Sequence, residues 1–137
     1  MRGKHGLQAL VLLMAALIGI GAGAEQTVVV TDADAGREIV LAAGGALEVR
    51  IKAQPSTGFR WVVGQVDASV LAPQGEAVFE SLARPSSGPA LVGAPETEVL
   101  RFRAMAAGQT ALTLDYIQPW RKNVPPAKQF LLHARVE

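Results

Sequence analysis

The sequence contains no cysteine and, beyond its first 24 residues, only one histidine. The lack of cysteine excludes a lipoprotein anchor, a thiol catalyst, a disulfide framework and any metal site built on thiolates. The remaining histidine, His133, cannot form part of a Ser-His-Asp set, because no acid and nucleophile pattern accompanies it. We expect His133 to point outward from the last strand as a solvated surface residue.

The acidic residues are also arranged in a way that argues against catalysis. Metal sites need several convergent histidines or carboxylates, and a glycosidase needs two acids in one cleft. Here the acids are scattered singly, and the segment TDAD, residues 31–34, is typical of a turn. We therefore predict that the chain is not an enzyme and that it holds no metal and no cofactor.

The first 24 residues have the pattern of a secretory signal peptide. Arg2 and Lys4 precede a long uncharged apolar stretch, which ends in the small residues Ala22-Gly23-Ala24. An uncleaved anchor is the alternative, but a bilayer span takes about 20 apolar residues and this run is shortened by Gln8 and its Gly/Ala end. We expect cleavage before Glu25, export to the periplasm or the medium, and no membrane attachment afterwards.

Cleavage at this position changes the charge balance of the chain. Removing Arg2 and Lys4 from 13 basic and 12 acidic residues leaves 11 basic and 12 acidic ones, a net charge near −1. Without a basic surplus to contact phosphate groups, nucleic acid is not an expected partner. The remaining 113 residues, 25–137, have the size of a single domain, for which we expect a monomer.

Apolar and polar residues alternate along most of the mature chain, which is the period of half-buried β-strands. In LEVRIK, for example, Leu47, Val49 and Ile51 share one face and the charged residues share the other. Glycine- and proline-rich turns separate the segments, and no helical period is present. We predict an all-β fold, an antiparallel β-sandwich of about eight strands, at residues 27–31, 37–42, 47–52, 59–66, 76–82, 98–104, 110–116 and 129–136.

Three connections between these strands are too long or too rich in proline for simple hairpin turns. They are residues 53–58, 84–97 and 117–128. Long, proline-stiffened loops in a small domain are usually functional. Proline also lowers the entropy that a loop loses when it is immobilised on a partner.

The three loops carry motifs of a known inhibitor family. QPSTGFRW, residues 54–61, resembles the N-P-T-T-G-[YF]-x-W loop of the chagasin family, inhibitors of papain-like cysteine peptidases. GAPETEVLRF, residues 93–102, is similar to that family's G-x-G-G-T-x-x-[WLF]-x-F segment. YIQPWRK, residues 116–122, resembles its Y-x-R-P-W segment. The motifs occur in the family's order and span nearly all of the mature chain.

The resemblance implies an immunoglobulin-like β-sandwich whose loops, residues 54–59, 84–97 and 117–122, form a wedge at one end. It further implies a proteinaceous, non-covalent, competitive inhibitor that inserts this wedge into the active-site cleft of a papain-like cysteine peptidase. The target-binding residues carried over from the motifs are Gln54, Pro55, Ser56, Thr57, Gly58, Phe59, Gly93, Ala94, Pro95, Glu96, Gln118, Pro119 and Trp120.

The residue types of the first loop suit that role. Pro55 favours an extended backbone at Gln54, and Gly58 permits a positive φ at the tip. Ser56 and Thr57 are narrow enough to enter a cleft, and their hydroxyls can form hydrogen bonds there.

Aromatic residues beside the loops have two expected roles. Phe59 and Trp61 lie two positions apart on one strand face, so we expect them to attach the first loop to the core. Trp120, behind Pro119, is either a contact residue of the kind that dominates interfaces or a side chain tucked under its own loop.

Three positions depart from the family's motifs. The first-loop Asn is Gln54 here, the paired glycines of the second loop are Pro95 and Glu96, and the Arg of R-P-W is Gln118. These changes affect potency and target choice more than fold. The alternative function is an exported immunoglobulin-like binding or assembly module that uses the inhibitor fold for a different ligand, because fold alone does not fix function.

Overall fold

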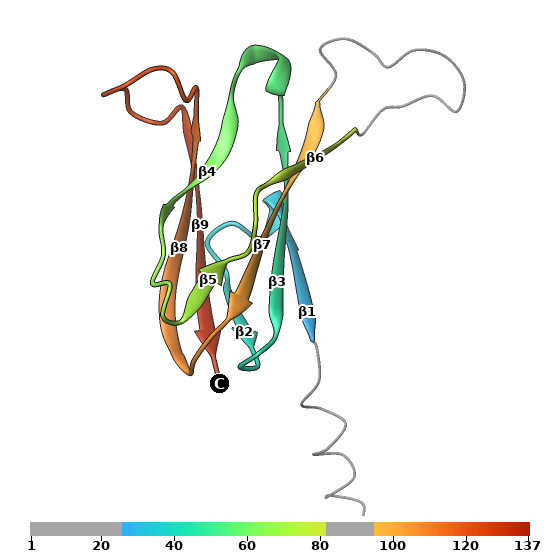
Figure 1. The fold of residues 1–137 in the computed structure, drawn as a ribbon, viewed down its shortest axis with the longest axis vertical. Coiled ribbons are helices and arrows are strands. Elements are labelled where there is room, and N and C mark those ends of the chain that lie inside the picture. The colour runs from blue at the N-terminus through green and yellow to red at the C-terminus, as the bar shows by residue number, and fades with distance from the viewer. Residues whose placement is uncertain (1–25, 82–94) are drawn as a thin grey trace, which may run out of the picture.

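The computed structural model describes residues 26–81 and 95–137, which form two β-sheets packed face to face (Figure 1). The five-stranded sheet contains β1 (Thr27–Thr31), β3 (Ala46–Ala53), β7 (Glu96–Ala104), β5 (Leu71–Pro73) and β6 (Val78–Ser81). The four-stranded sheet contains β2 (Glu38–Leu41), β9 (Lys128–Val136), β8 (Gly108–Ile117) and β4 (Arg60–Gln65). The 3-10 turns η1 (Asp32–Asp34) and η2 (Pro55–Thr57) follow β1 and β3. The predicted signal peptide lies outside the described residues.

The core lies between the two sheets and consists of the apolar side chains that the alternation places on the inner face of each strand. Leu112, Leu114 and Tyr116 on β8 are all buried, while the residues between them are half-buried. Trp61 on β4 is only 5% exposed, which confirms that it is a core residue. His133 on β9 is exposed, as predicted.

The β-sandwich is confirmed, with two corrections to the predicted strands. β1 pairs with β3 and β2 pairs with β9 in parallel, whereas the sequence predicts antiparallel pairing throughout. After β1, the chain passes through β2 in the opposite sheet before it enters β3. β3 therefore runs in the same direction as β1, and no hairpin joins the two strands. The structure has one strand more than predicted, namely β5, whose three residues end in a proline and show no alternation of apolar and polar side chains.

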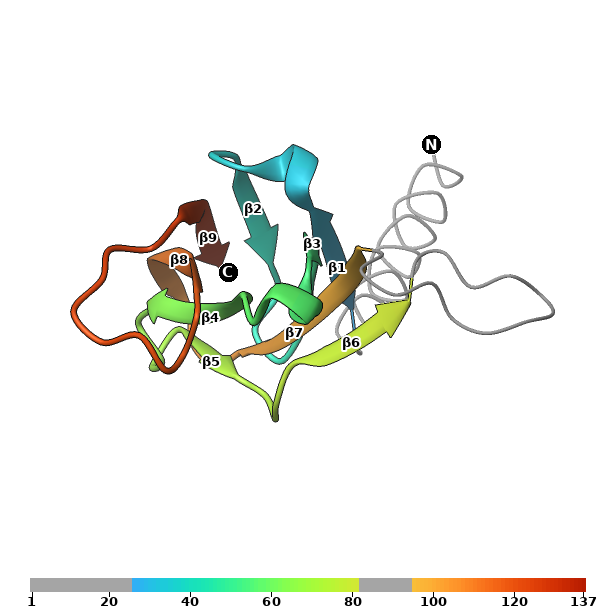
Figure 2. The same cartoon turned by 90° about the horizontal axis from the view of Figure 1, so that it is seen from above.

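The candidate site lies in the connections at one end of the sandwich. The β3–β4 connection contains η2 and carries the chain from one sheet to the other. The β8–β9 connection, residues 118–127, lies at the same end, as Figures 1 and 2 show. Among residues 26–81 and 95–137, no helix is long and apolar enough to cross a bilayer.

Candidate functional site

The first loop, residues 54–59, is a single tight turn. Gln54 has φ −126° and ψ 80°, outside the helical region, as expected before a proline. Gly58 has φ 83°, which confirms the positive φ predicted from its position. The backbone N–H groups of Thr57 and Gly58 donate to the carbonyls of Gln54 and Pro55 at 3.0 and 2.9 Å. The tip is therefore closed by its own backbone hydrogen bonds.

The two hydroxyl residues of the tip have different surroundings. Thr57 is exposed, but its Oγ1 donates to the Gln54 carbonyl at 2.6 Å, inside the loop. Ser56 is exposed, and its hydroxyl has no hydrogen bond to any other described residue. Thr57 thus uses its hydroxyl to stabilise the turn, since Oγ1 also accepts from the Phe59 backbone N–H at 3.4 Å, while the Ser56 hydroxyl is free to bond to a partner.

A cluster of aromatic side chains supports the base of the loop. The Tyr116 hydroxyl accepts a hydrogen bond from the Gln54 backbone N–H at 2.9 Å. The Tyr116 ring stacks on Phe59, with ring centroids 5.1 Å apart, and contacts the Trp61 ring, with centroids 4.8 Å apart. Trp61 Nε1 donates to the Lys52 carbonyl at 2.9 Å, which ties β4 to the end of β3. Phe59 and Trp61 therefore attach the loop to the core, as predicted, with Tyr116 between them.

A buried acid completes this base. Glu98 on β7 is 0% exposed, and its Oε1 accepts a hydrogen bond from the Trp61 backbone N–H at 2.7 Å. Glu98 Oε2 has no hydrogen-bond partner within the part of the chain that the structure describes. Burial raises the pKa of Glu98, because the charged carboxylate loses its hydration, and the Trp61 N–H and the charge of Arg60 oppose this only in part. Glu98 connects β7 to β4 where the first loop enters its strand.

The third loop, residues 117–122, contacts the first loop directly. Gln118 Nε2 donates to the Thr57 carbonyl at 3.0 Å. Trp120 is 64% exposed, yet the end of its ring lies against Gly58, where an added Cβ would be 1.9 Å from Trp120 Cη2. Trp120 is therefore not tucked under its own loop; it lies beside the tip and presents most of its surface to solvent. Glycine at position 58 is required for this contact as well as for the backbone angle.

The second loop, residues 84–97, is described only at its C-terminal end. Gly93 and Ala94 lie outside the described residues. Pro95 is exposed, but Glu96 begins β7, where it pairs with Ala53 and Ser81. The sequence places the end of the loop at Thr97 and the strand from residue 98, whereas β7 begins two residues earlier, at Glu96. The extra strand residues were missed because "PET" interrupts the alternation that marks the rest of β7.

Two residues of the site were not predicted to belong to it. Tyr116 appears in the sequence as an inward residue of β8, and only the structure brings its hydroxyl to Gln54. Glu98 could have been found, because the alternation that turns Leu100 and Phe102 inward also turns this acid inward. An acid at a core position of a strand is rare, and it indicates a buried hydrogen-bonding role.

The first and third loops have a shape that is suited to binding. The described residues contain no group of three or more His, Asp or Glu residues placed to hold a metal ion. The first and third loops instead present a narrow polar tip beside an exposed indole. A protruding element of this kind is complementary to a groove on a partner.

The chain is similar to known peptidase inhibitors. The model of the chagasin family of peptidase inhibitors, I42, matches residues 40–134. Chagasin of Trypanosoma cruzi is 28% identical over 108 residues, covering 77% of this chain and 94% of that protein.

Two solved structures are similar to this fold. The cysteine protease inhibitor EhICP2 of Entamoeba histolytica superposes with a TM-score of 0.69 and 17% identity, covering 82% of this chain and 97% of that one. PbICP-C, solved in complex with falcipain-2, gives a TM-score of 0.52 and 12% identity, covering 85% of this chain and 93% of that one.

Proposed function

Because the chain belongs to the chagasin family of peptidase inhibitors, we propose that it inhibits papain-like cysteine peptidases. Inhibition is non-covalent and competitive, and the loops at one end of the sandwich occupy the active-site cleft of the target. The chain acts as a binding protein and not as an enzyme. The observation that carries this proposal is the contact of the first and third loops through Gln118, Thr57, Gly58 and Trp120.

The conformation of the first loop supports insertion without cleavage. A peptidase cleaves backbone that it can hold extended across its nucleophile. Residues 54–58 form a turn closed by two backbone hydrogen bonds, with a left-handed residue at Gly58. Opening this turn would also break the Gln54–Tyr116 hydrogen bond. The tip can therefore fill a cleft while its peptide bonds stay out of reach of the nucleophile.

The rigidity of the loop lowers the cost of binding. Association loses free energy whenever a mobile loop or side chain becomes ordered, by about 0.5–1.5 kcal/mol for each immobilised side chain. Here the loop is already fixed at Gln54 by Tyr116, at Phe59 by stacking, and at Thr57 by Gln118. Most of the ordering is therefore complete before the partner arrives.

Trp120 is the expected anchor of the third loop. Exposed, rigid aromatic side chains account for much of the binding energy at protein interfaces. With 64% of its surface accessible and one end against Gly58, the indole can bury a large apolar area without moving. We assign the contact surface to residues 54–59, 95–96 and 118–120, together with Gly93 and Ala94 of the second loop.

The site of action follows from the N-terminus of the sequence. A basic start, an uncharged apolar run and the ending Ala22-Gly23-Ala24 support export by cleavage before Glu25. Within this proposal the inhibitor acts in the periplasm or outside the cell. Mass spectrometry of the N-terminus of the exported protein would test this, and a mature chain that still begins at Met1 would contradict it.

The function is tested by titrating residues 25–137 against papain and a cathepsin L-type peptidase with a fluorogenic substrate. We expect tight competitive inhibition. Thr57→Arg should weaken it by at least about 100-fold, because a long cationic side chain at the tip cannot enter the cleft. Trp120→Ala should weaken it by at least about tenfold.

Circular dichroism of both variants controls for folding. Absence of inhibition by the folded wild-type domain at micromolar concentration would contradict the proposed function. Equal inhibition by wild type and Thr57→Arg would contradict the proposed binding mode.

A further inference from the structure

The ten lysine and arginine side chains of the described residues fall into two groups. Four take part in ion pairs with carboxylates, namely Arg37, Arg50, Arg101 and Arg135. Within residues 26–81 and 95–137, the other six form no ion pair: Lys52, Arg60, Arg103, Arg121, Lys122 and Lys128. Five of these six lie on or next to the first and third loops, and Arg103 lies toward the far end of β7.

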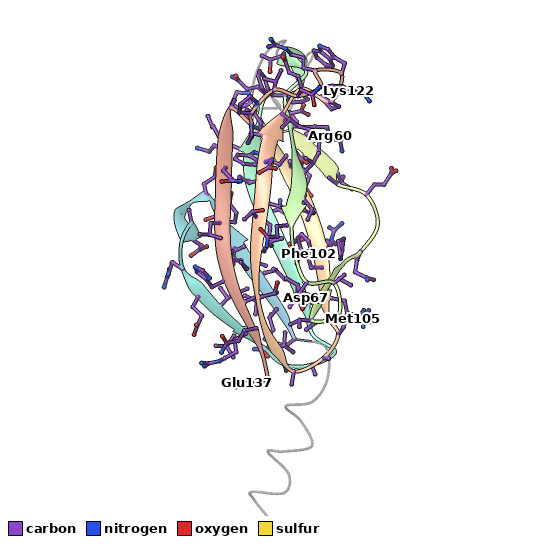
Figure 3. All side chains as sticks on the ribbon, turned by 90° about the vertical axis from the view of Figure 1, so that its left-hand side faces the viewer. Arg60, Asp67, Phe102, Met105, Lys122 and Glu137 are labelled. Atoms are coloured by element: carbon purple, nitrogen blue, oxygen red, sulfur yellow. The ribbon has the colours of Figure 1, made fainter. Side chains whose placement is uncertain are left out.

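Four of the unpaired cations border the proposed contact surface, and we call them the basic rim: Lys52, Arg121, Lys122 and Lys128. All four are exposed. Arg121 and Lys122 directly follow Trp120, and Figure 3 shows Lys122 at the loop end of the molecule. Lys52 and Lys128 line one groove together with Gln54 and Tyr116. The rim therefore extends along the third loop and across to the base of the first loop.

No described acid forms an ion pair with the basic rim, although the Asp32 carboxylate accepts a hydrogen bond from the Lys52 backbone N–H at 3.3 Å. Residues 117–128 contain three cations and no Asp or Glu. Asp115, just before them, accepts a hydrogen bond from Gln129 Nε2 at 2.9 Å instead. Glu96, at the start of β7, forms no ion pair with the rim in the described part of the chain. Lys128 Nζ lies 5.5 Å from the centre of the Tyr116 ring and Arg121 Nη1 donates to Gln118 Oε1 at 3.4 Å, but neither contact cancels a positive charge. The field of the rim therefore remains available to act on a partner.

We propose that the basic rim selects papain-like peptidases whose active-site cleft is bordered by acidic residues. This inference rests on the proposed function, since the rim surrounds the loops that enter the cleft. Charges at the border of an interface act mainly on the association rate, and complementary ones can raise it by about 10- to 1,000-fold. Similar charges on the two partners have the opposite effect, so the rim also disfavours clefts with basic borders.

The test measures association and dissociation rate constants with two papain-like peptidases of known structure, one with an acidic and one with a basic cleft border. The variant Arg121→Glu/Lys122→Glu reverses half of the rim. Arg37→Glu/Arg103→Glu makes the same change in net charge away from the loops, and its only described ion pair, Arg37–Asp34, is exposed and contributes little. Each protein is measured at NaCl concentrations from about 0.02 to 0.5 M, over which the screening length falls from tens of ångströms to a few.

For the acidic-border peptidase we expect the wild-type association rate to fall by about tenfold or more as salt rises. The rim variant should associate about tenfold more slowly at low salt, with a dissociation rate within about twofold of wild type. The control variant should stay close to wild type, and the rim variant should associate faster with the basic-border peptidase.

A salt-independent association rate, or equal effects of the rim and control variants, would overturn the inference while inhibition itself remained. Failure of the wild type to inhibit either peptidase at any salt concentration would instead contradict the proposed function.

Discussion

The two tryptophans beyond the N-terminal segment lie at the same end of the sandwich, yet they occupy opposite environments. Trp61 at the base of the first loop is 5% exposed, with its backbone N–H on Glu98 and its ring against Tyr116. Trp120 in the third loop is 64% exposed, and every residue from 119 to 129 around it is exposed. One tryptophan holds a loop in place, and the other presents most of its ring to solvent.

The two environments explain how a small domain can present a rigid surface. The first loop is anchored by side chains that belong to the core, so its shape is determined by the packing of the two sheets. The third loop has little core contact of its own and rests on the first through Gln118 and Trp120. Disturbing the core should therefore change stability, whereas disturbing the contact between the loops should change binding.

We expect the greatest difference in the free energy of unfolding between the alanine variants of the two tryptophans. Trp61→Ala should lower the free energy of unfolding by about 3–5 kcal/mol, because it leaves a large cavity beside Tyr116 and removes the bond to the Lys52 carbonyl. Trp120→Ala should change it by no more than about 0.5 kcal/mol, since most of that side chain is already in water. Urea denaturation of both variants measures this, and equal losses would contradict the contrast between the two environments.

Gly58→Ala is expected to affect both stability and inhibition. A Cβ at φ 83° costs about 1–2 kcal/mol, and it would also overlap the Trp120 ring. Gly44→Ala is a matched control, because Gly44 has φ 86° and no atom within 4 Å of an added Cβ. Gly58→Ala should lose at least as much stability in urea as Gly44→Ala, but only Gly58→Ala should raise the inhibition constant, by about tenfold or more. A similar rise for Gly44→Ala would show that backbone strain alone weakens inhibition.

Glu98 should make stability depend on pH. Because burial raises its pKa above the ordinary value of 4.5, the unfolded chain releases this proton at a lower pH than the folded protein. The free energy of unfolding contributed by Glu98 therefore falls as the pH rises from 4.5 through the folded pKa. Glu98→Gln keeps an oxygen for the Trp61 N–H but cannot ionise, so its stability relative to wild type should increase with pH across that window.

Urea denaturation of Glu98→Gln and wild type at about pH 4 and pH 7.5 measures this change, which follows from the linkage between proton binding and folding. Glu96→Gln, two residues away on β7, controls for the loss of one negative charge. A stability difference between Glu98→Gln and wild type that is the same at both pH values would contradict the prediction.

The smallest expected effect concerns Gln118. Removing its amide with Gln118→Ala breaks the bond to the Thr57 carbonyl and should cost about 0.5–1.5 kcal/mol at most, because the bond is exposed. Inhibition should weaken a few-fold, since the first and third loops lose their polar link. Gln129→Ala removes a comparable exposed bond, to Asp115, and should leave inhibition unchanged. Inhibition assays of the two variants distinguish the link between loops from a general loss of hydrogen bonding.

The sequence predicts much of the fold because strand alternation is a local property. Eight strands and the inward position of Trp61 follow from neighbouring residues two positions apart, and the turn at Gly58 follows from its residue types. The sequence does not predict β5, because a three-residue strand is too short to show a period. It also does not predict the two parallel pairs, because the direction of pairing depends on which sheet the chain joins next.

The candidate site likewise has features that local sequence predicts and features that it does not. The motifs at residues 54–61 and 116–122 are local, so they can be read from neighbouring residues, and they predict both the position of the two loops and the residue types at their tips. The tertiary structure was needed to show that Tyr116 supports Gln54, that Trp120 rests on Gly58, and that the cations around them form no ion pair with the described residues. These contacts join residues about 60 positions apart, such as Gln54 and Tyr116, and no local pattern encodes them. They exist because two sheets pack with a shared end, where distant loops become neighbours.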